Sequence, residues 1–158
     1  MSVQKKAPLG RVLVIGGCGF LGHHIVSLLH DRYDCTISVL DLRTSRNRHS
    51  SGEVTYHDGD ITSLESLLSI FNSIKPDVVI HTASPVAITG TNDLFYKVNV
   101  GGTKCVVEAC QKTGVKALVF TSSASIISDN TTDLVNADER WPVIPEKLQR
   151  EYYSWTKV

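Results

Sequence analysis

Three glycines near the start of the chain constrain its fold more than any other feature. In the run RVLVIGGCGFLGHHIV, which starts at Arg11, Gly16, Gly19 and Gly22 form a GxxGxxG pattern. Apolar, β-branched residues before them predict a strand over 11–15, and the helical spacing after them predicts a helix over 20–32. Glycines in such a place allow a tight turn, close approach of a pyrophosphate to the backbone, and close helix–sheet packing. A glycine-rich turn alone is a weak signal, so the rest of the chain decides what it means.

The remaining chain alternates between strand-like and helix-like segments. Further strands are predicted over 36–42, 53–57, 78–82 and 116–122, and helices over 63–74, 93–113 and 146–158. The near-continuous apolar strands predict a parallel sheet that is covered on both faces. We therefore expect an α/β fold, a Rossmann-type doubly wound parallel sheet that is truncated after the fifth strand and the start of the following helix. Ligands of such sheets bind at the carboxyl ends of the strands.

The composition is that of a globular domain and argues against several kinds of partner. The chain is 42% hydrophobic and 20% charged, with a formal net charge of +0. It therefore has no field to attract nucleic acid or an anionic membrane. The four cysteines form no CxxC pair and no metal-ligand pattern with the histidines, which predicts reduced thiols and no metal site. We expect no signal peptide, and no apolar stretch approaches the ~20 residues that span a bilayer.

An acidic residue, Asp41, lies at the end of the second predicted strand. A carboxylate at this place accepts hydrogen bonds from the ribose hydroxyls of adenosine and repels a 2′-phosphate, so it favours NAD over NADP. Arg43, Arg46 and Arg48 follow closely and favour NADP if they bind that phosphate. A surface carboxylate without a ligand is the alternative for Asp41. We expect NAD as the cofactor, with NADP as the second choice.

Near the end of the chain, Tyr153 and Lys157 lie four residues apart on a predicted helix, so their side chains share a face. An ammonium lowers the pKa of a neighbouring phenol, normally about 10, so that the phenolate can take a proton from an alcohol. Ser122, Ser123 and Ser125 follow the fifth predicted strand, and each offers a hydroxyl to stabilise a substrate oxygen. The alternatives are a solvated Tyr–Lys pair and serines that only cap the strand end.

Taken in order, these motifs resemble the extended short-chain dehydrogenase/reductase family. They are GxxGxxG, Asp41, GDIT at 59–62, VNVGGTK at 98–104, VFTSSAS at 119–125 and YxxxK at 153–157. Within the family, VLVIGGCGFLGHHIV, HTASP and NVGGTKCVVEAC resemble the 3β-hydroxysteroid dehydrogenase branch most. The resemblance covers nearly the whole chain and implies an NAD(P)-binding Rossmann domain over 1–158. It further implies oxidation of the 3β-hydroxyl of a sterol or steroid, with a 4α-carboxysterol that then loses carbon dioxide as the expected substrate.

The resemblance also implies roles for individual residues. Ser123 would polarise the substrate oxygen, Tyr153 would accept the hydroxyl proton, and Lys157 would activate the phenol and hold the nicotinamide ribose. The expected cofactor-binding residues are Gly16, Gly19, Phe20, Leu21, Gly22, Asp41, Asp60, Ile61, Thr82, Ala83, Asn99, Tyr153 and Lys157. At 81–84, HTAS replaces the asparagine-bearing version that is more usual in the family. No role carries onto the histidines at 23, 24 and 81, which we expect to be structural.

Extended members of the family continue beyond the position that matches Lys157, into further strands and a small substrate domain. We therefore expect the chain to be a fragment that is unstable or inactive alone. The expected partners are a small-molecule sterol or steroid and, at full length, a second copy in a homodimer, without nucleic acid or a transmembrane segment. The expected location is the cytoplasm or the cytosolic face of the endoplasmic reticulum. The alternative functions are a nucleotide-sugar epimerase or reductase and a non-catalytic NAD-binding module.

Overall fold

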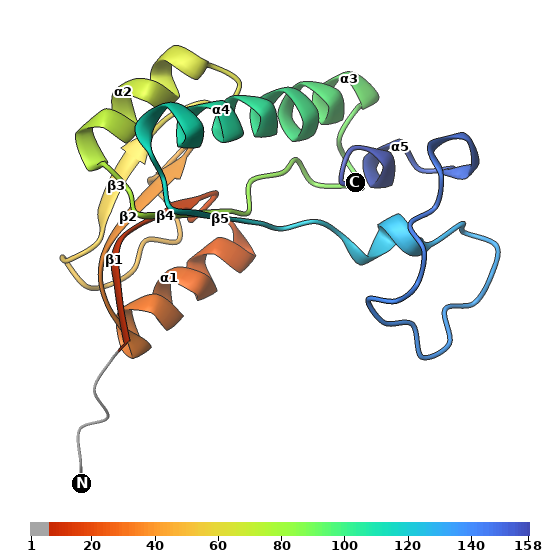
Figure 1. Ribbon diagram of the computed structural model, residues 1–158, viewed down its shortest axis with the longest axis horizontal. Helices are drawn as coiled ribbons and strands as arrows, with labels where there is room; N and C mark the ends of the chain where they lie inside the picture. The colour runs from red at the N-terminus through yellow and green to blue at the C-terminus, as the bar shows by residue number, and fades with distance from the viewer. Residues whose placement is uncertain (1–6) are drawn as a thin grey trace, which may run out of the picture.

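The computed structural model describes residues 7–158. Their five strands form one parallel sheet (Figure 1). The strands are β1 (Ala7–Ile15), β2 (Tyr33–Asp41), β3 (Thr55–Asp58), β4 (Val78–His81) and β5 (Ala117–Phe120). Their order is β3-β2-β1-β4-β5, so the chain passes from one side of β1 to the other between β3 and β4. This crossing is the topological switch point, the place where open α/β sheets bind their ligands. The expected Rossmann-type parallel sheet is confirmed.

Helices cover both faces of this sheet. Helix α1 (Phe20–Arg32) lies on one face, whereas α2 (Leu64–Ile74) and α4 (Thr103–Thr113) lie side by side on the other (Figure 1). The side chain of Ser63 caps α2 by accepting a hydrogen bond from the backbone N–H of Ser66. Among residues 7–158, no helix has the length and apolar character needed to cross a membrane.

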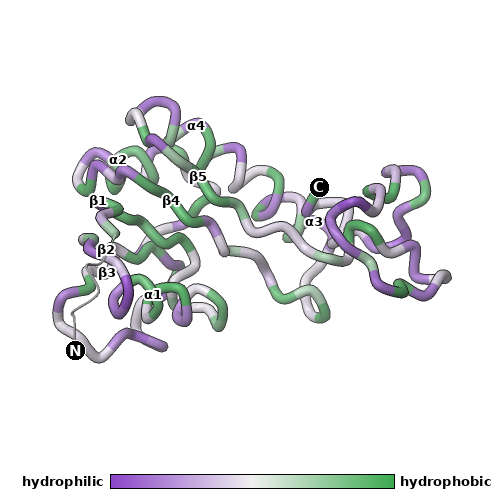
Figure 2. The backbone as a smooth tube through the Cα atoms, turned by 60° about the horizontal axis from the view of Figure 1, so that its bottom comes forward, coloured by the Kyte–Doolittle hydropathy of each residue, from purple (hydrophilic) through white to green (hydrophobic). Residues whose placement is uncertain are grey.

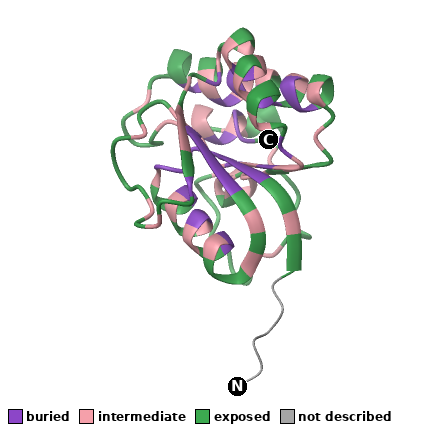
Figure 3. Cartoon of the chain, turned by 90° about the vertical axis from the view of Figure 1, so that its left-hand side faces the viewer, coloured by how far each residue is buried: buried purple, intermediate pink, exposed green. Residues whose placement is uncertain are grey.

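Strand β1 supplies alternate residues to two hydrophobic cores, as the two-residue period of a strand requires. Val12 and Val14 pack with Val26 of α1 on one face of the sheet. Leu13 and Ile15 pack on the other face, in the core that α2 and α4 complete. Figure 3 shows the buried stretch of the central strands, and Figure 2 shows hydrophobic residues gathered along the same elements. The two cores hold β1 rigidly and thereby fix the start of the glycine loop.

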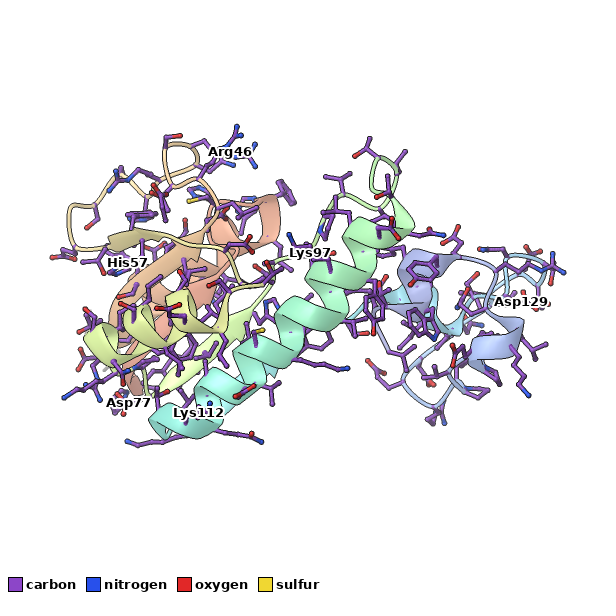
Figure 4. The ribbon with its side chains drawn as sticks, turned by 90° about the horizontal axis from the view of Figure 1, so that it is seen from above. Arg46, His57, Asp77, Lys97, Lys112 and Asp129 are labelled. Atoms are coloured by element: carbon purple, nitrogen blue, oxygen red, sulfur yellow. The ribbon has the colours of Figure 1, made fainter. Side chains whose placement is uncertain are left out.

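The register of the strands aligns their carboxyl ends. Ile15 of β1 pairs with Leu40 of β2 and with His81 of β4, and His81 in turn pairs with Phe120 of β5. The residues that follow four of the strands therefore meet along a single edge of the sheet. Figure 4 shows Arg46, which follows β2, at the opposite end of the sheet from Asp77, which precedes β4.

The long helix predicted over 93–113 is present but interrupted. It consists of α3 (Asn92–Phe95), a π-helical segment η1 (Tyr96–Gly102) and α4. As predicted, the helix closes at Gly114, whose left-handed backbone (φ 73°) ends α4. The π-helical interior has no signal in the apolar spacing, which reports only the average helical period.

The prediction of one helix over 146–158 is wrong. A 3₁₀ turn, Glu146–Leu148, is followed by extended backbone at Gln149 (ψ 114°) and Glu151 (ψ 117°). Helix α5 then covers only Tyr152–Trp155. Gln149 instead uses its side-chain amide to donate a hydrogen bond to a carbonyl of the loop after β5, so a tertiary contact overrides the local helical preference.

The segment 121–151 leaves the sheet after β5 and forms an irregular lobe to the side of it (Figures 1 and 4). Its regular parts are the short 3₁₀ turns Ala124–Ile127 and Glu146–Leu148. Asp129, which Figure 4 labels, lies in this lobe away from the sheet. The chain returns through α5, which contacts α3 and the turn at Ala124–Ile127.

Candidate functional site

The glycine loop between β1 and α1 has a shape that side chains would prevent. Gly16 has a left-handed backbone (φ +81°), and a Cβ there would lie 2.7 Å from the backbone nitrogen of Ala83. A Cβ at Gly22 would lie 2.2 Å from the carbonyl oxygen of Gly16, so α1 packs directly on the loop. These contacts give the first and third glycines the turn and packing roles that the motif predicts.

The N-terminus of α1 is suited to an anion. Its N-cap is Gly19, which has no side chain to accept hydrogen bonds from the first turn, and the first turn contains no acidic residue. The helix has 13 residues, and its aligned peptide dipoles favour negative charge at this end. The backbone N–H groups of Phe20 and Leu21, two of the expected cofactor-binding residues, belong to this first turn.

Asp41 joins the end of β2 to the glycine loop. Its carboxylate accepts a hydrogen bond of 3.0 Å from the backbone N–H of Cys18 and a longer one, 3.5 Å, from that of Arg43. A second link is made by the backbone, because the N–H of Gly16 donates to the carbonyl of Leu40 at 2.7 Å. The carboxylate is therefore held in place beside the loop.

A cleft of about 620 Å³ opens at the switch point. It is lined by Ile15, Gly16, Gly19, Leu40, Asp41, Leu42, Arg43, Ser45, Arg46, Gly59, Asp60, Ile61, Thr82, Ala83, Ser84, Pro85, Val86, Leu94 and Val98. Seven of the expected cofactor-binding residues are in this lining: Gly16, Gly19, Asp41, Asp60, Ile61, Thr82 and Ala83. Three others, Phe20, Leu21 and Gly22, begin the helix that adjoins it, whereas Asn99, Tyr153 and Lys157 are not among the lining residues.

Two of the expected residues, Thr82 after β4 and Asp60 after β3, shape the cleft as well as line it. The hydroxyl of Thr82 donates to the carbonyls of Ile15 (2.9 Å) and Gly16 (3.3 Å), and so fixes the end of β1. The carboxylate of Asp60 accepts a hydrogen bond from the backbone N–H of Thr62, which shapes the turn before α2. Thr82 therefore has a structural task of its own in addition to facing the cleft.

The arginines that bear on cofactor choice are in different surroundings. Arg43 and Arg46 line the cleft beside Asp41. Arg48 instead lies over the ring of Tyr56, 4.3 Å from its centroid. The loop that carries them is anchored by Asp58, which accepts a hydrogen bond from the backbone N–H of Thr44; this bond lowers the pKa of the Asp58 carboxyl.

Lys157 lies at the carboxyl end of β5. Its ammonium donates a hydrogen bond of 2.7 Å to the carbonyl of Thr121, and its own carbonyl accepts one of 2.6 Å from the hydroxyl of Ser122. The residue is only 3% exposed, and burial lowers the pKa of its amine. Of the three candidate serines, Ser122 is thus engaged with the backbone of Lys157.

Ser123 and Tyr153 lie in the same region without bonding to Lys157. The hydroxyl of Ser123 is 2.7 Å from that of Ser125, and the ring of Tyr153 packs edge-on against Phe95 with centroids 5.4 Å apart. No hydrogen bond within residues 7–158 joins Tyr153 to Lys157. Helix α5 includes Tyr153 but ends before Lys157, so the two are not on one continuous helix as predicted.

Asn99 lies in the π-helical segment η1 and is buried. Its side-chain amide donates a hydrogen bond of 2.9 Å to the hydroxyl of Thr156, and its amide oxygen has no partner within residues 7–158. Asn99 therefore ties the long helix to the segment that carries Tyr153 and Lys157. Thr156 was not anticipated from the sequence, and only its position between those two residues could have suggested it.

The sequence also did not single out several residues of the cleft. Leu42, Pro85, Val86 and Val98 add apolar surface to its lining. Leu42 directly follows β2, and Pro85 and Val86 lie in the loop after β4; their places after strand ends are the signal that could have indicated them.

The parallel sheet, its glycine loop and the cleft at the switch point define a Rossmann-type domain of the α/β class. Residues 13–158 match the model of the 3-beta hydroxysteroid dehydrogenase/isomerase family. The chain belongs to this family, and the resemblance drawn from its motifs is confirmed.

Relatives with assigned names support the same placement. The chain is 43% identical over 153 residues to sterol-4-alpha-carboxylate 3-dehydrogenase, decarboxylating, of Schizosaccharomyces pombe, with 96% of the chain and 44% of the relative covered. It is 37% identical over 148 residues to the enzyme of that name from Bos taurus, with 94% and 39% covered. The chain therefore spans less than half the length of these relatives.

Solved structures share the fold. UDP-glucose 4-epimerase of Thermus thermophilus, in complex with NAD, matches with a TM-score of 0.78 and 30% identity, covering 93% of the chain and 47% of the epimerase. An epimerase of Methanothermobacter thermautotrophicus matches with a TM-score of 0.78 and 25% identity, covering 97% and 45%.

Proposed function

We propose that the full-length protein oxidises the 3β-hydroxyl of a sterol that carries a 4α-carboxylate, with NAD as hydride acceptor, and that the product loses carbon dioxide. Membership of the 3-beta hydroxysteroid dehydrogenase/isomerase family supports the reaction class. The names of the yeast and bovine relatives support the substrate class, and the epimerase complex with NAD supports the cofactor. Residues 1–158 form the NAD(P)-binding domain in this proposal.

The observation that carries the proposal is the composition of the cleft at the switch point. The glycine loop, Asp41 and the residues after β4 line it together, although they come from distant parts of the sequence. A purely structural glycine turn would need neither an uncapped helix N-terminus nor a carboxylate fixed beside it. The combination supports a ligand with both phosphate and ribose groups.

The residues of the cleft fit NAD. The first turn of α1 offers N–H groups to the pyrophosphate, and Asp41 keeps free lone pairs for ribose hydroxyls because each carboxylate oxygen accepts two hydrogen bonds. In this proposal Asp60 and Ile61 would contact the adenine, and Thr82 and Ala83 would line the cofactor at the end of β4. The fixed carboxylate of Asp41 favours NAD over NADP because it repels a 2′-phosphate.

The catalytic steps are assigned to residues at the carboxyl end of β5. Tyr153 accepts the proton of the 3β-hydroxyl, and Ser123 donates a hydrogen bond to the substrate oxygen as the C3 carbonyl forms. Lys157 supplies the positive charge that favours proton transfer to the phenolate. The chemistry that NAD supplies when bound is acceptance of the hydride released by C3. The resulting 3-keto-4-carboxylic acid is a β-keto acid, which loses carbon dioxide through its enol and needs no further catalytic group.

A nucleotide-sugar epimerase is the second candidate. The solved structures that share the fold include UDP-glucose 4-epimerase, and that likeness favours a nucleotide sugar as substrate. The identities to the sterol dehydrogenases are higher, which favours the first candidate. A non-catalytic NAD-binding module is the third alternative, and it predicts that Tyr153 has no effect on biological function.

We further propose that the protein acts in the cytoplasm or at the cytosolic face of the endoplasmic reticulum, as a homodimer at full length. The sterol substrate expected from the relatives partitions into membranes, which favours a membrane-adjacent place of action.

The decisive experiment measures substrate use by the full-length protein. With a 4α-carboxy-3β-hydroxysterol and NAD, we expect NADH formation and release of carbon dioxide in equal amounts. UDP-glucose and UDP-galactose serve as the comparison, and we expect no interconversion of the two. Epimerisation without sterol oxidation would replace the first candidate by the second, and NAD binding without turnover of either substrate would favour the non-catalytic module.

A further inference from the structure

Lys157 is a buried amine that has no acidic partner. It is 3% exposed, and no carboxylate within residues 7–158 forms an ion pair with it. Lysines are almost never this buried unless their charge is paired, because removing an ammonium from water is costly. A single backbone carbonyl, that of Thr121 at 2.7 Å, accepts a hydrogen bond from the ammonium. A second contact that favours the charged amine is therefore of interest.

The ring of Phe120 makes such a contact. The nitrogen of the Lys157 ammonium lies 4.7 Å from the centroid of this ring, within the range of a cation–π interaction. Phe120 is the last residue of β5, directly before Thr121, so the strand presents the aromatic face and the carbonyl from adjacent residues. The two contacts together define where the ammonium lies.

The neighbouring strand makes the surroundings of this pair nearly free of other charges. His81 of β4 pairs with Phe120 in the sheet register, and their rings lie 5.6 Å apart. His81 is fully buried; burial and the nearby Lys157 charge lower the pKa of its imidazole to about 4, so it is neutral at pH 7. Thr103 of α4, 3.1 Å from the His81 ring nitrogen, is uncharged. Within residues 7–158 no carboxylate pairs with Lys157, so the contacts of its ammonium are the Thr121 carbonyl and the Phe120 ring.

We propose that Phe120 is a positioning residue that holds the Lys157 ammonium at the carboxyl end of β5 through its aromatic face. The inference rests on the proposed function, in which Lys157 assists proton transfer to Tyr153. Its role is distinct from ordinary core packing because it depends on the π-system of the side chain and not on its volume.

The test compares two substitutions in the full-length protein. Phe120→Leu removes the aromatic face but keeps an apolar side chain, whereas Phe120→Tyr keeps the face. We expect Phe120→Leu to lower kcat by about threefold to thirtyfold, the range of one cation–π interaction, and to move the acidic limb of the pH–rate profile to higher pH. The KM for the sterol should stay within twofold, and Phe120→Tyr should match the wild type in all three quantities.

Val119→Leu is the matched control. Val119 precedes Phe120 on β5, so its side chain points to the opposite face of the sheet, where it is 53% exposed. We expect it to leave kcat and the pH profile unchanged. Chemical denaturation of all variants identifies any loss of activity that follows from unfolding.

A second measurement does not depend on activity. Labelling of lysines with acetic anhydride at several pH values, followed by mass spectrometry, reports the reactivity of the Lys157 amine. We expect faster labelling of Lys157 in Phe120→Leu than in wild type and Phe120→Tyr, with the exposed Lys112 unchanged in all three. Equal labelling and equal pH profiles in the Leu and Tyr variants would overturn the inference. Absence of sterol oxidation in the wild type would instead overturn the proposed function, while the labelling would still test Phe120.

Discussion

The carboxylate of Asp41 accepts a hydrogen bond from the backbone N–H of Cys18, at 3.0 Å. Cys18 lies inside the glycine loop and is fully buried, so this bond connects the end of β2 to the phosphate-binding turn after β1. Asp41 therefore has two tasks that are separable by mutation. It shapes the loop through Cys18, and in the proposed complex it faces the adenosine ribose.

Replacement of Asp41 by alanine should reduce affinity for NAD by about tenfold to a hundredfold, because a hydrogen bond to a charged group contributes about 1.5–3 kcal/mol. The ratio of NADP to NAD affinity should rise, since Arg43 and Arg46 remain in the cleft without the opposing carboxylate. Titration of protein fluorescence with each dinucleotide measures both effects. Asp34→Ala, at the exposed start of the same strand, is the control. An unchanged NADP to NAD ratio in Asp41→Ala would remove Asp41 from the cofactor site.

Replacement of Gly22 by alanine should destabilise the protein by about 3 kcal/mol, because the added Cβ would lie 2.2 Å from the backbone oxygen of Gly16. Backbone cannot yield as a flexible side chain can, so the helix must move away from the loop. Urea denaturation followed by circular dichroism measures the change. Gly52→Ala is the matched control, since a Cβ there meets nothing within 4 Å. Equal stability of the two variants would contradict the close packing of α1 on the loop.

Replacement of Tyr153 by phenylalanine should lower kcat by about a hundredfold to ten-thousandfold, the usual contribution of a proton-transferring side chain. Binding of NAD should change little, because the ring stays packed against Phe95. Steady-state kinetics and dinucleotide titration separate the two effects. Tyr152→Phe, next in sequence and packed on Trp155, is expected to retain activity. If it were Tyr152→Phe that lost activity, the proton acceptor would have been assigned to the wrong tyrosine.

His81 should make stability depend on pH. Its folded-state pKa of about 4 lies below the ordinary value of 6.5, so the unfolded chain binds more protons between these values. The free energy of unfolding should therefore fall as pH decreases from about 6.5 to about 4. Urea denaturation at pH 7 and pH 5 measures this loss, which should be smaller in His81→Gln. His24 lies on the exposed surface of α1 and serves as the control. Between pH 7 and pH 5, His24→Gln should lose as much stability as the wild type loses.

The sheet and the glycine loop were predictable because their signals are local. The strand from 11 to 15 is apolar without interruption after Arg11, and Gly16 and Gly22 follow it closely, so the strand–turn–helix unit is encoded within a short stretch. The position of Asp41 beside the loop was also predictable, because parallel strands align their carboxyl ends. The assignment of its ribose contact remains a prediction.

The end of the chain was less predictable because its conformation is set by tertiary contacts. Lys157 bonds to the carbonyl after β5, and Ser122 bonds back to the carbonyl of Lys157; neither interaction leaves a trace in the local spacing of residues. Spacing suggested a continuous helix there, and the chain forms an extended stretch and the short helix α5 instead. The π-helical turn around Asn99 was missed for a similar reason, since its hydrogen bond to Thr156 joins segments far apart in sequence.

The division of β1 between two cores has a further consequence. Val12 and Val14 belong to the layer of α1, while Leu13 and Ile15 belong to the layer of α2 and α4. If either layer unfolds, one side of β1 becomes exposed to water. Unfolding of one layer therefore also destabilises the packing of the other. The domain should consequently lose both layers in a single cooperative transition, and the glycine loop at the end of β1 should lose its shape at the same point.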